Sequence, residues 1–221
     1  MIAWFLGLAA AAQAPERAPD YFASGSEPFW GLEIRGRQIR FTPNDGSESD
    51  DGIVAVLPRR QPLRGGYRLV TRRFTVLVRH LACEDVGERR FRDTVTVTMR
   101  GRRYLGCGGI LLPPTVLEAT DWRIEAIGTA RVDGDGYVMG FYEGRISAQA
   151  GCNRLTGPFR QRGARLTAGP IAATRMACPG PRMAHERTVL RLLGGPMQIS
   201  YPAGDVLILT GSGVTIRLRR V

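Results

Sequence analysis

The stretch that decides the fold runs from residue 151 to residue 179 and reads GCNRLTGPFRQRGARLTAGPIAATRMACP. Two cysteines bracket this glycine-rich passage, and a segment with clear helix start and stop signals comes directly after it. Pro181 stands in the expected first turn, and Gly194-Gly195 follows the expected last turn. We therefore expect a helix over residues 181–193, with an apolar face formed by Met183, Val189, Leu190 and Leu193.

The four cysteines fall into two local pairs, Cys83 with Cys107 and Cys152 with Cys178. Four cysteines allow three connectivities. Pairing neighbours in sequence keeps each bridge within one domain, so we predict these two disulfides. A four-cysteine zinc site is the alternative, but the chain lacks the C-x-x-C spacing that structural zinc sites usually show.

Residue types at the start of the deciding stretch suit a tight turn. Gly and Asn adopt positive φ angles readily, so Gly151 and Asn153 are expected to do so here, and Asn153 to bond its own backbone. The Thr174 hydroxyl and the Arg175 guanidinium would tie this turn to the helix start. A purely structural turn is the favoured interpretation, and a ligand site around Asn153, Arg154 and Arg175 is the alternative.

Residues 1–14, MIAWFLGLAAAAQA, have the pattern of a cleaved export signal. The apolar run is too short to span a bilayer and ends in an A-x-A cleavage pattern. Disulfides persist in oxidising compartments, so the cysteine pairs agree with export. We predict a protein of the periplasm or cell envelope, with no transmembrane span once the signal is removed.

The remaining sequence predicts a mainly β protein with one helix, of the α+β class. Apolar residues alternate with polar ones at Trp30, Leu32 and Ile34 and again over residues 94–99, which is the pattern of half-buried strands. We expect two small antiparallel domains, an all-β domain over 20–113 and a second domain over 121–221. Residues 114–120, beginning in the Pro113-Pro114 pair, are the predicted linker.

The second half resembles the META domain, the HslJ-like family of bacterial envelope proteins. The resemblance rests on Trp122, residues 151–154 with Gly157, residues 171–178, and Glu186 in the expected helix. It implies a small β-rich fold with one helix, an exported location and an association with stress or antibiotic tolerance. The family has no agreed catalytic mechanism, so the resemblance implies none.

The first half resembles an uncharacterised family of bacterial exported proteins, sometimes found beside META or lysozyme-inhibitor domains. Its matching segments are residues 23–30 (ASGSEPFW), 83–85 (CED) and 104–108 (YLGCG). The resemblance implies the exported location again and no particular chemistry.

Nucleophilic catalysis is disfavoured because a nucleophile needs a base within reach. The chain has only two histidines, and a dyad of Cys152 with His185 requires a reduced cysteine in an oxidising compartment. His80 is expected to be a packed or surface histidine, and His185-Glu186 lacks the second histidine of the zinc protease motif.

Acidic residues offer weak metal and catalytic motifs. Asp133 and Asp135 fall in a glycine-rich loop whose spacing does not fit a calcium loop. Paired carboxylates for glycoside cleavage are conceivable as Glu27 with Glu33 or Glu84 with Asp85. We predict no catalytic residues, no metal and no cofactor.

The net charge of +11 comes from arginine alone, because the chain contains no lysine. The excess is spread over both halves, with 17 arginines and 12 acidic residues before the Pro113-Pro114 pair and 14 and 8 after it. A nucleic-acid site would need clustering on one element, so none is predicted. We expect anionic envelope components, such as lipopolysaccharide or acidic phospholipid, to be the partners.

These observations favour a non-enzymatic exported envelope protein that supports envelope integrity or stress tolerance. A binding module or inhibitor acting on an envelope component or lysozyme is the second hypothesis, although lysozymes are mostly cationic and the like charge would repel them. An envelope glycan hydrolase is the third.

Overall fold

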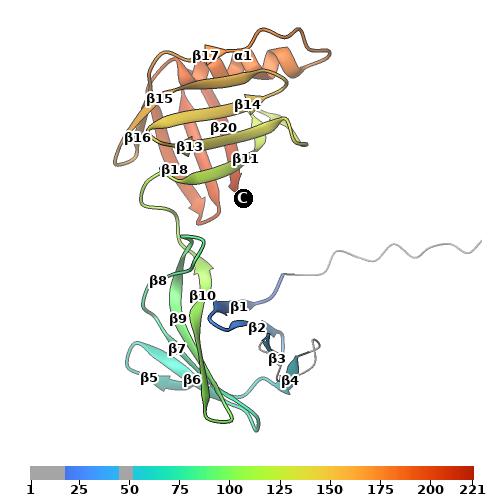
Figure 1. Ribbon diagram of the computed structural model, residues 1–221, viewed down its shortest axis with the longest axis vertical. Helices are drawn as coiled ribbons and strands as arrows, with labels where there is room; N and C mark the ends of the chain where they lie inside the picture. Colours follow the sequence, from blue (N-terminus) through green and yellow to red (C-terminus); the bar gives the residue numbers. More distant parts are fainter. Residues whose placement is uncertain (1–17, 45–51) are drawn as a thin grey trace, which may run out of the picture.

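The computed structural model describes residues 18–44 and 52–221, which form two antiparallel β-sheets and one helix. The first sheet curves into a half-barrel and the second closes into an eight-stranded barrel (Figure 1). Residues 1–14, predicted as an export signal, lie outside the described residues. The fold class predicted from the sequence is confirmed.

The half-barrel has the strand order β4-β3-β2-β1-β10-β9-β7-β6-β5, with β8 paired to β9. Its strands are β1 (Tyr21–Ser26), β2 (Phe29–Arg35), β3 (Gln38–Pro43), β4 (Ile53–Val56), β5 (Gln61–Leu63), β6 (Gly66–Val70), β7 (Thr75–Arg79), β8 (Cys83–Glu84), β9 (Arg90–Met99) and β10 (Arg102–Leu111). Alternate residues of these strands point inward and form the first core, in which Phe41 packs against Phe74 and Tyr104.

The second sheet has the order β12-β11-β13-β14-β15-β16-β18-β19-β20 and closes because β11 also pairs with β20. Its elements are β11 (Thr120–Ile127), β12 (Ala130–Arg131), β13 (Tyr137–Tyr142), β14 (Arg145–Ala150), β15 (Arg154–Arg162), β16 (Arg165–Ala168), β17 (Ala172–Ala173), α1 (Arg182–Leu193), β18 (Met197–Ala203), β19 (Val206–Gly211) and β20 (Val214–Arg220).

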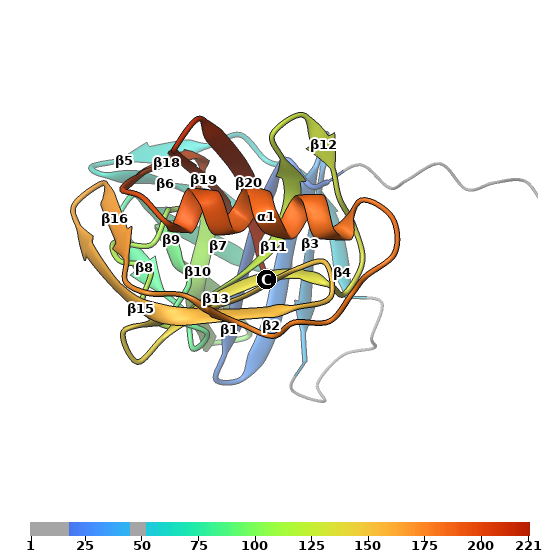
Figure 2. The same ribbon diagram turned by 90° about the horizontal axis from the view of Figure 1, so that it is seen from above.

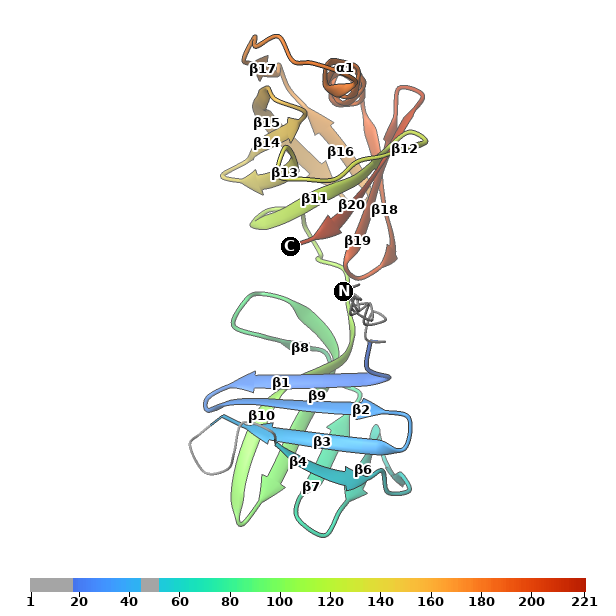
Figure 3. The same ribbon diagram turned by 90° about the vertical axis from the view of Figure 1, so that its right-hand side faces the viewer.

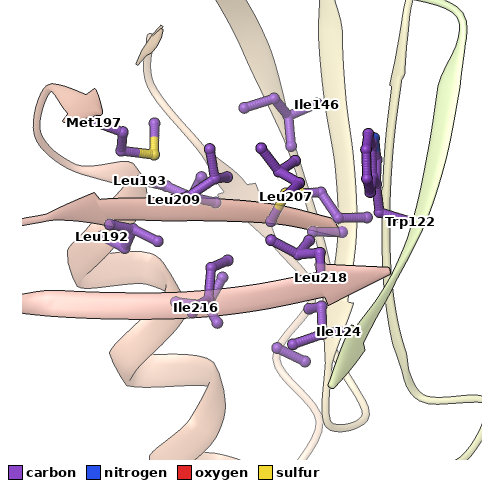
Figure 4. Packing of buried hydrophobic residues seen from close by; sticks show 14 of the residues in the cluster. Trp122, Ile124, Ile146, Leu192, Leu193, Met197, Leu207, Leu209, Ile216 and Leu218 are labelled. Carbon is purple, nitrogen blue, oxygen red and sulfur yellow. The ribbon is translucent and has the colours of Figure 1, made fainter. Parts of the chain in front are cut away.

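The helix α1 lies across one end of this barrel (Figure 2). Its buried residues are Glu186, Val189, Leu192 and Leu193. The last three belong to the barrel core, in which Leu192 and Leu193 lie near Ile216 and Leu209 (Figure 4). Met183 and Leu190, predicted to lie on the apolar face, are only partly buried, because the face that packs on the barrel consists of Glu186, Val189, Leu192 and Leu193.

A buried tryptophan anchors the other end of the barrel core. The indole nitrogen of Trp122 donates to the Thr120 hydroxyl at 2.7 Å, and that hydroxyl donates to the Leu117 carbonyl at 2.5 Å. Leu117 is fully buried in the barrel core, so the segment predicted as a linker packs onto the second domain. Among the described residues the two cores share none, and the half-barrel and the barrel are separate bodies joined by one connection (Figure 3).

Both predicted disulfides are present, Cys83–Cys107 in the half-barrel and Cys152–Cys178 in the barrel. Residues 171–176 form a strand only at Ala172–Ala173, and the turn before β10 is formed by Arg100 and Gly101, both at positive φ. The strand β15 runs through Gly157 and Pro158, although both residue types are typical of loops.

The separate cores predict that the barrel folds alone. A fragment of residues 115–221 retains Leu117, Trp122 and both partners of the Cys152–Cys178 bridge, so we expect one cooperative unfolding transition by circular dichroism in denaturant. A fragment beginning at residue 121 loses Leu117 and should be less stable by about 2–4 kcal/mol. Absence of a cooperative transition in the longer fragment would contradict two independent cores.

Candidate functional site

Asn153 lies at the start of β15 and is 1% exposed. Its amide nitrogen donates to the Met176 carbonyl at 3.0 Å and to a Glu186 carboxylate oxygen at 2.8 Å. Its amide oxygen accepts from the Thr174 hydroxyl at 2.8 Å and from the Met176 backbone N–H at 2.7 Å. The side chain thus uses its full hydrogen-bonding capacity, which leaves none for a ligand.

The network joins three segments of the chain: the start of β15, the irregular segment of residues 174–178 that ends at Cys178, and the helix α1. Thr174 completes it by accepting from the Arg154 backbone N–H at 3.1 Å. Glu186 is 6% exposed, so its carboxylate needs the Asn153 donor. The arrangement is that of a structural pin holding the helix over the barrel mouth.

Three predictions for this motif need correction. Asn153 does not have a positive φ, whereas Gly151 does at +146°, with its Cα facing the Arg182 backbone. The Asn153 side chain bonds other segments and not its own backbone, because its buried amide lies between Met176, Thr174 and Glu186. The Arg175 and Arg154 side chains are exposed, and within residues 18–44 and 52–221 neither makes a hydrogen bond to the pin.

Replacing Asn153 with Ala should destabilise the protein by about 2–4 kcal/mol, because Glu186 and the Met176 backbone lose their partners while staying buried. Chemical denaturation measures this loss. Arg154→Ala is the control, since an exposed side chain should change stability by no more than about 0.5 kcal/mol. Equal effects of the two substitutions would contradict the pin.

The half-barrel carries a groove of about 1040 Å³ on the side of the Cys83–Cys107 bridge. It lies between the β1–β2 turn, the end of β3 and the loop from β8 to β9. Exposed apolar side chains stand at its rim, with Phe29 64%, Leu105 56% and Val86 80% exposed. A concave site lined by apolar groups and a few polar ones is the usual form of a ligand site.

The floor of the groove depends on two glycines. The Trp30 indole nitrogen donates to the Leu105 carbonyl at 3.0 Å, passing between β1 and β10. A Cβ on Gly25 would lie 2.1 Å from that carbonyl oxygen, and one on Gly106 would lie 2.7 Å from the Trp30 ring. Only glycine permits this approach, so the segment around Glu27 and Trp30 has a packing reason for its composition.

Four charged residues line the groove, namely Glu27, Glu84, Asp85 and Arg89. Asp85 accepts from the Gly87 and Arg89 backbone N–H groups at 3.0 and 2.9 Å and forms an ion pair with the Arg89 guanidinium at 2.7 Å. Burial alone would raise the pKa of Asp85, but these hydrogen bonds and the guanidinium charge outweigh it and lower the pKa.

Of the two hypothesised carboxylate pairs, only one has both of its members in the groove. Glu84 and Asp85 both line the groove, as does Glu27, whereas Glu33 lies on the outer face of β2 in an ion pair with Arg35 at 3.2 Å. A glycosidase acid needs a raised pKa, and Asp85 has the opposite shift. Asp85 therefore orders the loop.

Lowering the pH should open the loop at Asp85. Because the folded pKa is depressed, its stabilising contribution is complete above the ordinary value of 3.8 and is lost as the pH falls through the lower folded value. The Gly87 and Arg89 amide signals, followed by NMR, should shift together in that range. Asp85→Asn should remove the transition, and Glu84→Gln, the matched control, should leave it in place.

A second polar cluster in the half-barrel was not predicted. Asp93 is fully buried on β9 and accepts from the Tyr21 hydroxyl at 3.1 Å, while its other oxygen pairs with His80 Nδ1 at 2.8 Å. Burial, and then the Asp93 charge, raise the pKa of Tyr21. Gly109, at φ +79°, makes room, since a Cβ there would lie 2.5 Å from the carboxylate.

This cluster links β1, β9 and the segment after β7. Sequence alone offered only an isolated His80 and an acidic residue in a strand. The other histidine, His185, pairs with the Tyr137 hydroxyl at 2.9 Å, and Cys152 is bridged, so the hypothesised dyad is absent.

The described residues contain no cluster of metal ligands and no helix suited to cross a membrane. No cluster of three or more potential metal ligands occurs in residues 18–44 and 52–221, and Asp133 and Asp135 lie in a turn between β12 and β13. In the same part of the chain no helix has the length and apolar character needed to cross a membrane.

Comparison with known proteins finds similar solved structures and one matching family. An NMR structure of a protein from Burkholderia xenovorans is similar, at 24% identity over 48% of this chain and 83% of that one, with a TM-score of 0.41. A second NMR structure has 25% identity over 45% of this chain and 87% of that one, also with a TM-score of 0.41. Curated proteins gave no match. Residues 115–221 match the META domain family, and the C-terminal barrel of this chain is therefore a META domain.

Proposed function

We propose that this chain is a non-enzymatic, exported envelope protein whose half-barrel groove binds a ligand and whose META domain is the stable support beside it. The observation that carries the proposal is the groove of about 1040 Å³ with its rim of exposed apolar side chains. A role in envelope integrity or stress tolerance is part of the proposal, and the META domain match and the two disulfides support it.

Two disulfides support the exported location, because such bridges persist where thiols are oxidised. The Cys83–Cys107 bridge also forms part of the groove wall. An oxidising compartment keeps this bridge intact. The bridge in turn ties the loop from Cys83 to Arg89 covalently to β10 and so preserves the shape of the groove.

A non-catalytic role agrees with the chemistry of the polar groups. Asn153 is saturated by structural hydrogen bonds, all four cysteines are bridged, and Asp85 is engaged by Arg89. In each of these residues, the polar or sulfur atoms that could take part in a reaction are already engaged in a structural hydrogen bond, disulfide or ion pair. Ligand binding requires only the exposed groups that remain at the groove.

The charges around the groove indicate the ligand chemistry. Glu27, Glu84 and Asp85 oppose the single Arg89, so the groove is locally acidic on a chain whose net charge is +11. Phe29, Val86 and Leu105 add apolar surface. An extended segment that combines cationic and apolar groups, such as a basic amphipathic peptide, matches both features.

The test uses two short peptides with the same apolar residues and opposite charge, acetyl-Lys-Phe-Lys-Leu-amide and acetyl-Glu-Phe-Glu-Leu-amide. We expect only the cationic peptide to bind in calorimetry, and to shift amide signals of residues 83–89 and 105–107. Phe29→Ala should weaken binding about tenfold, because it removes a largely exposed apolar contact surface.

Phe22→Ala is the matched control. Phe22 is 40% exposed on the neighbouring strand β1 and does not line the groove, so its loss should leave the affinity within about twofold. Equal binding of the two peptides, or equal losses from the Phe29 and Phe22 substitutions, would overturn the proposal.

A further inference from the structure

The outer face of three adjacent META-domain strands carries arginine and no acidic residue. Strand alternation brings five arginines to the solvent side of β14, β15 and β16. These residues, called the arginine face below, are Arg145, Arg154, Arg160, Arg162 and Arg165. The inward positions of the same strands bear core residues such as Ile146, Leu155 and Leu166.

The densest part of the arginine face is the β15–β16 hairpin. Arg162 lies directly opposite Arg165, and Arg160 lies opposite Thr167. These four side chains surround a shallow pocket of about 270 Å³. Directly opposed residues have Cβ atoms about 5 Å apart, so the two guanidiniums repel each other in the free protein.

Carboxylates neutralise the arginines on another side of the same barrel. Arg217 and Arg219 of β20 pair with Glu125 at 3.1 and 2.5 Å, and Arg219 also contacts Asp205. The strands β14 and β15 lie on the side opposite β18 and β19 (Figure 3). Within residues 18–44 and 52–221, Arg160, Arg162 and Arg165 form no ion pair.

The contrast between the paired arginines of β20 and the arginines of the β15–β16 hairpin shows that positive charge is left unneutralised at one particular surface of the barrel. Like-charged cross-strand pairs are destabilising unless a counter-charge approaches them. A phosphate group suits this place, because each guanidinium offers a planar two-pronged donor that matches phosphate oxygens. The repulsion between Arg162 and Arg165 would then become a shared attraction for one anion.

We propose that the arginine face binds the phosphate groups of an anionic lipid surface. Three guanidiniums converge on the β15–β16 pocket, but Arg145 and Arg154 lie along β14 and at the far end of β15, too distant to share one small anion. An array of lipid phosphates engages all five at once. The inference rests on the exported envelope location proposed above, and not on the groove.

Vesicle co-sedimentation tests the proposal on the protein without its predicted export signal, with both domains present. The probes are vesicles of phosphatidylcholine with and without phosphatidylglycerol, at low and at physiological ionic strength. We expect binding only to the anionic vesicles, weakened by salt because exposed charges are screened over about 8 Å at physiological ionic strength. The triple variant Arg160→Gln, Arg162→Gln and Arg165→Gln should lose affinity roughly a hundredfold, at about fivefold for each arginine.

A second triple variant separates the arginine face from the overall charge. Arg59→Gln, Arg64→Gln and Arg103→Gln remove the same charge from exposed positions of the half-barrel. This control should keep its affinity within about twofold at physiological salt. Equal losses in the two variants would overturn the proposal in favour of diffuse attraction, as would absence of binding to anionic vesicles at low salt.

Inorganic phosphate distinguishes a lipid surface from a free anion as the source of the phosphate. Phosphate is titrated against chloride at constant ionic strength while the arginine side-chain NMR signals are followed. Lipid binding predicts weak phosphate shifts and unchanged vesicle binding. Saturable phosphate binding that displaces the vesicles would overturn the lipid assignment. Loss of peptide binding at the groove would leave this result unaffected, so the two proposals fail separately.

Discussion

The META domain depends on one amide side chain, Asn153, which is buried where three segments of the chain meet. Closing a β-barrel leaves its two ends open, and here a single helix covers one of them. A charged side chain on the buried face of a helix needs a polar partner, and the Glu186 carboxylate is such a group. Asn153 supplies the donor while binding the backbone at Met176, so the helix, β15 and the Cys178 segment are fixed together.

Much of this architecture was readable because it follows from local patterns. Alternation at Trp30, Leu32 and Ile34 predicted a strand whose odd and even residues have different environments, and the structure has that pattern. The proline and glycine signals bounded α1 to within one residue. The cysteine pairs were correct because each bridge joins residues of one domain that are near in sequence.

The sequence failed where long-range geometry decides. The partner of Asn153 is 33 residues away, and nothing in a turn-like motif indicates a buried carboxylate at that distance. Asp93 looked like an ordinary strand residue, and only the sheet order brings Tyr21 and His80 to it. Pro158 cannot donate to a ladder, so its residue type argues against a strand, yet it lies opposite Arg145 within β15.

Charge shows the same limit at the level of function. Composition revealed a uniform arginine excess in both halves, which predicts attraction to any anion without a place for it. Strand parity and register then divide these arginines into two classes. Arg217 and Arg219 meet Glu125 across β11 and β20, whereas Arg162 meets Arg165 across a two-residue turn. Equal numbers of charges therefore have different consequences: one group stabilises the barrel closure, and the other remains available to an external anion.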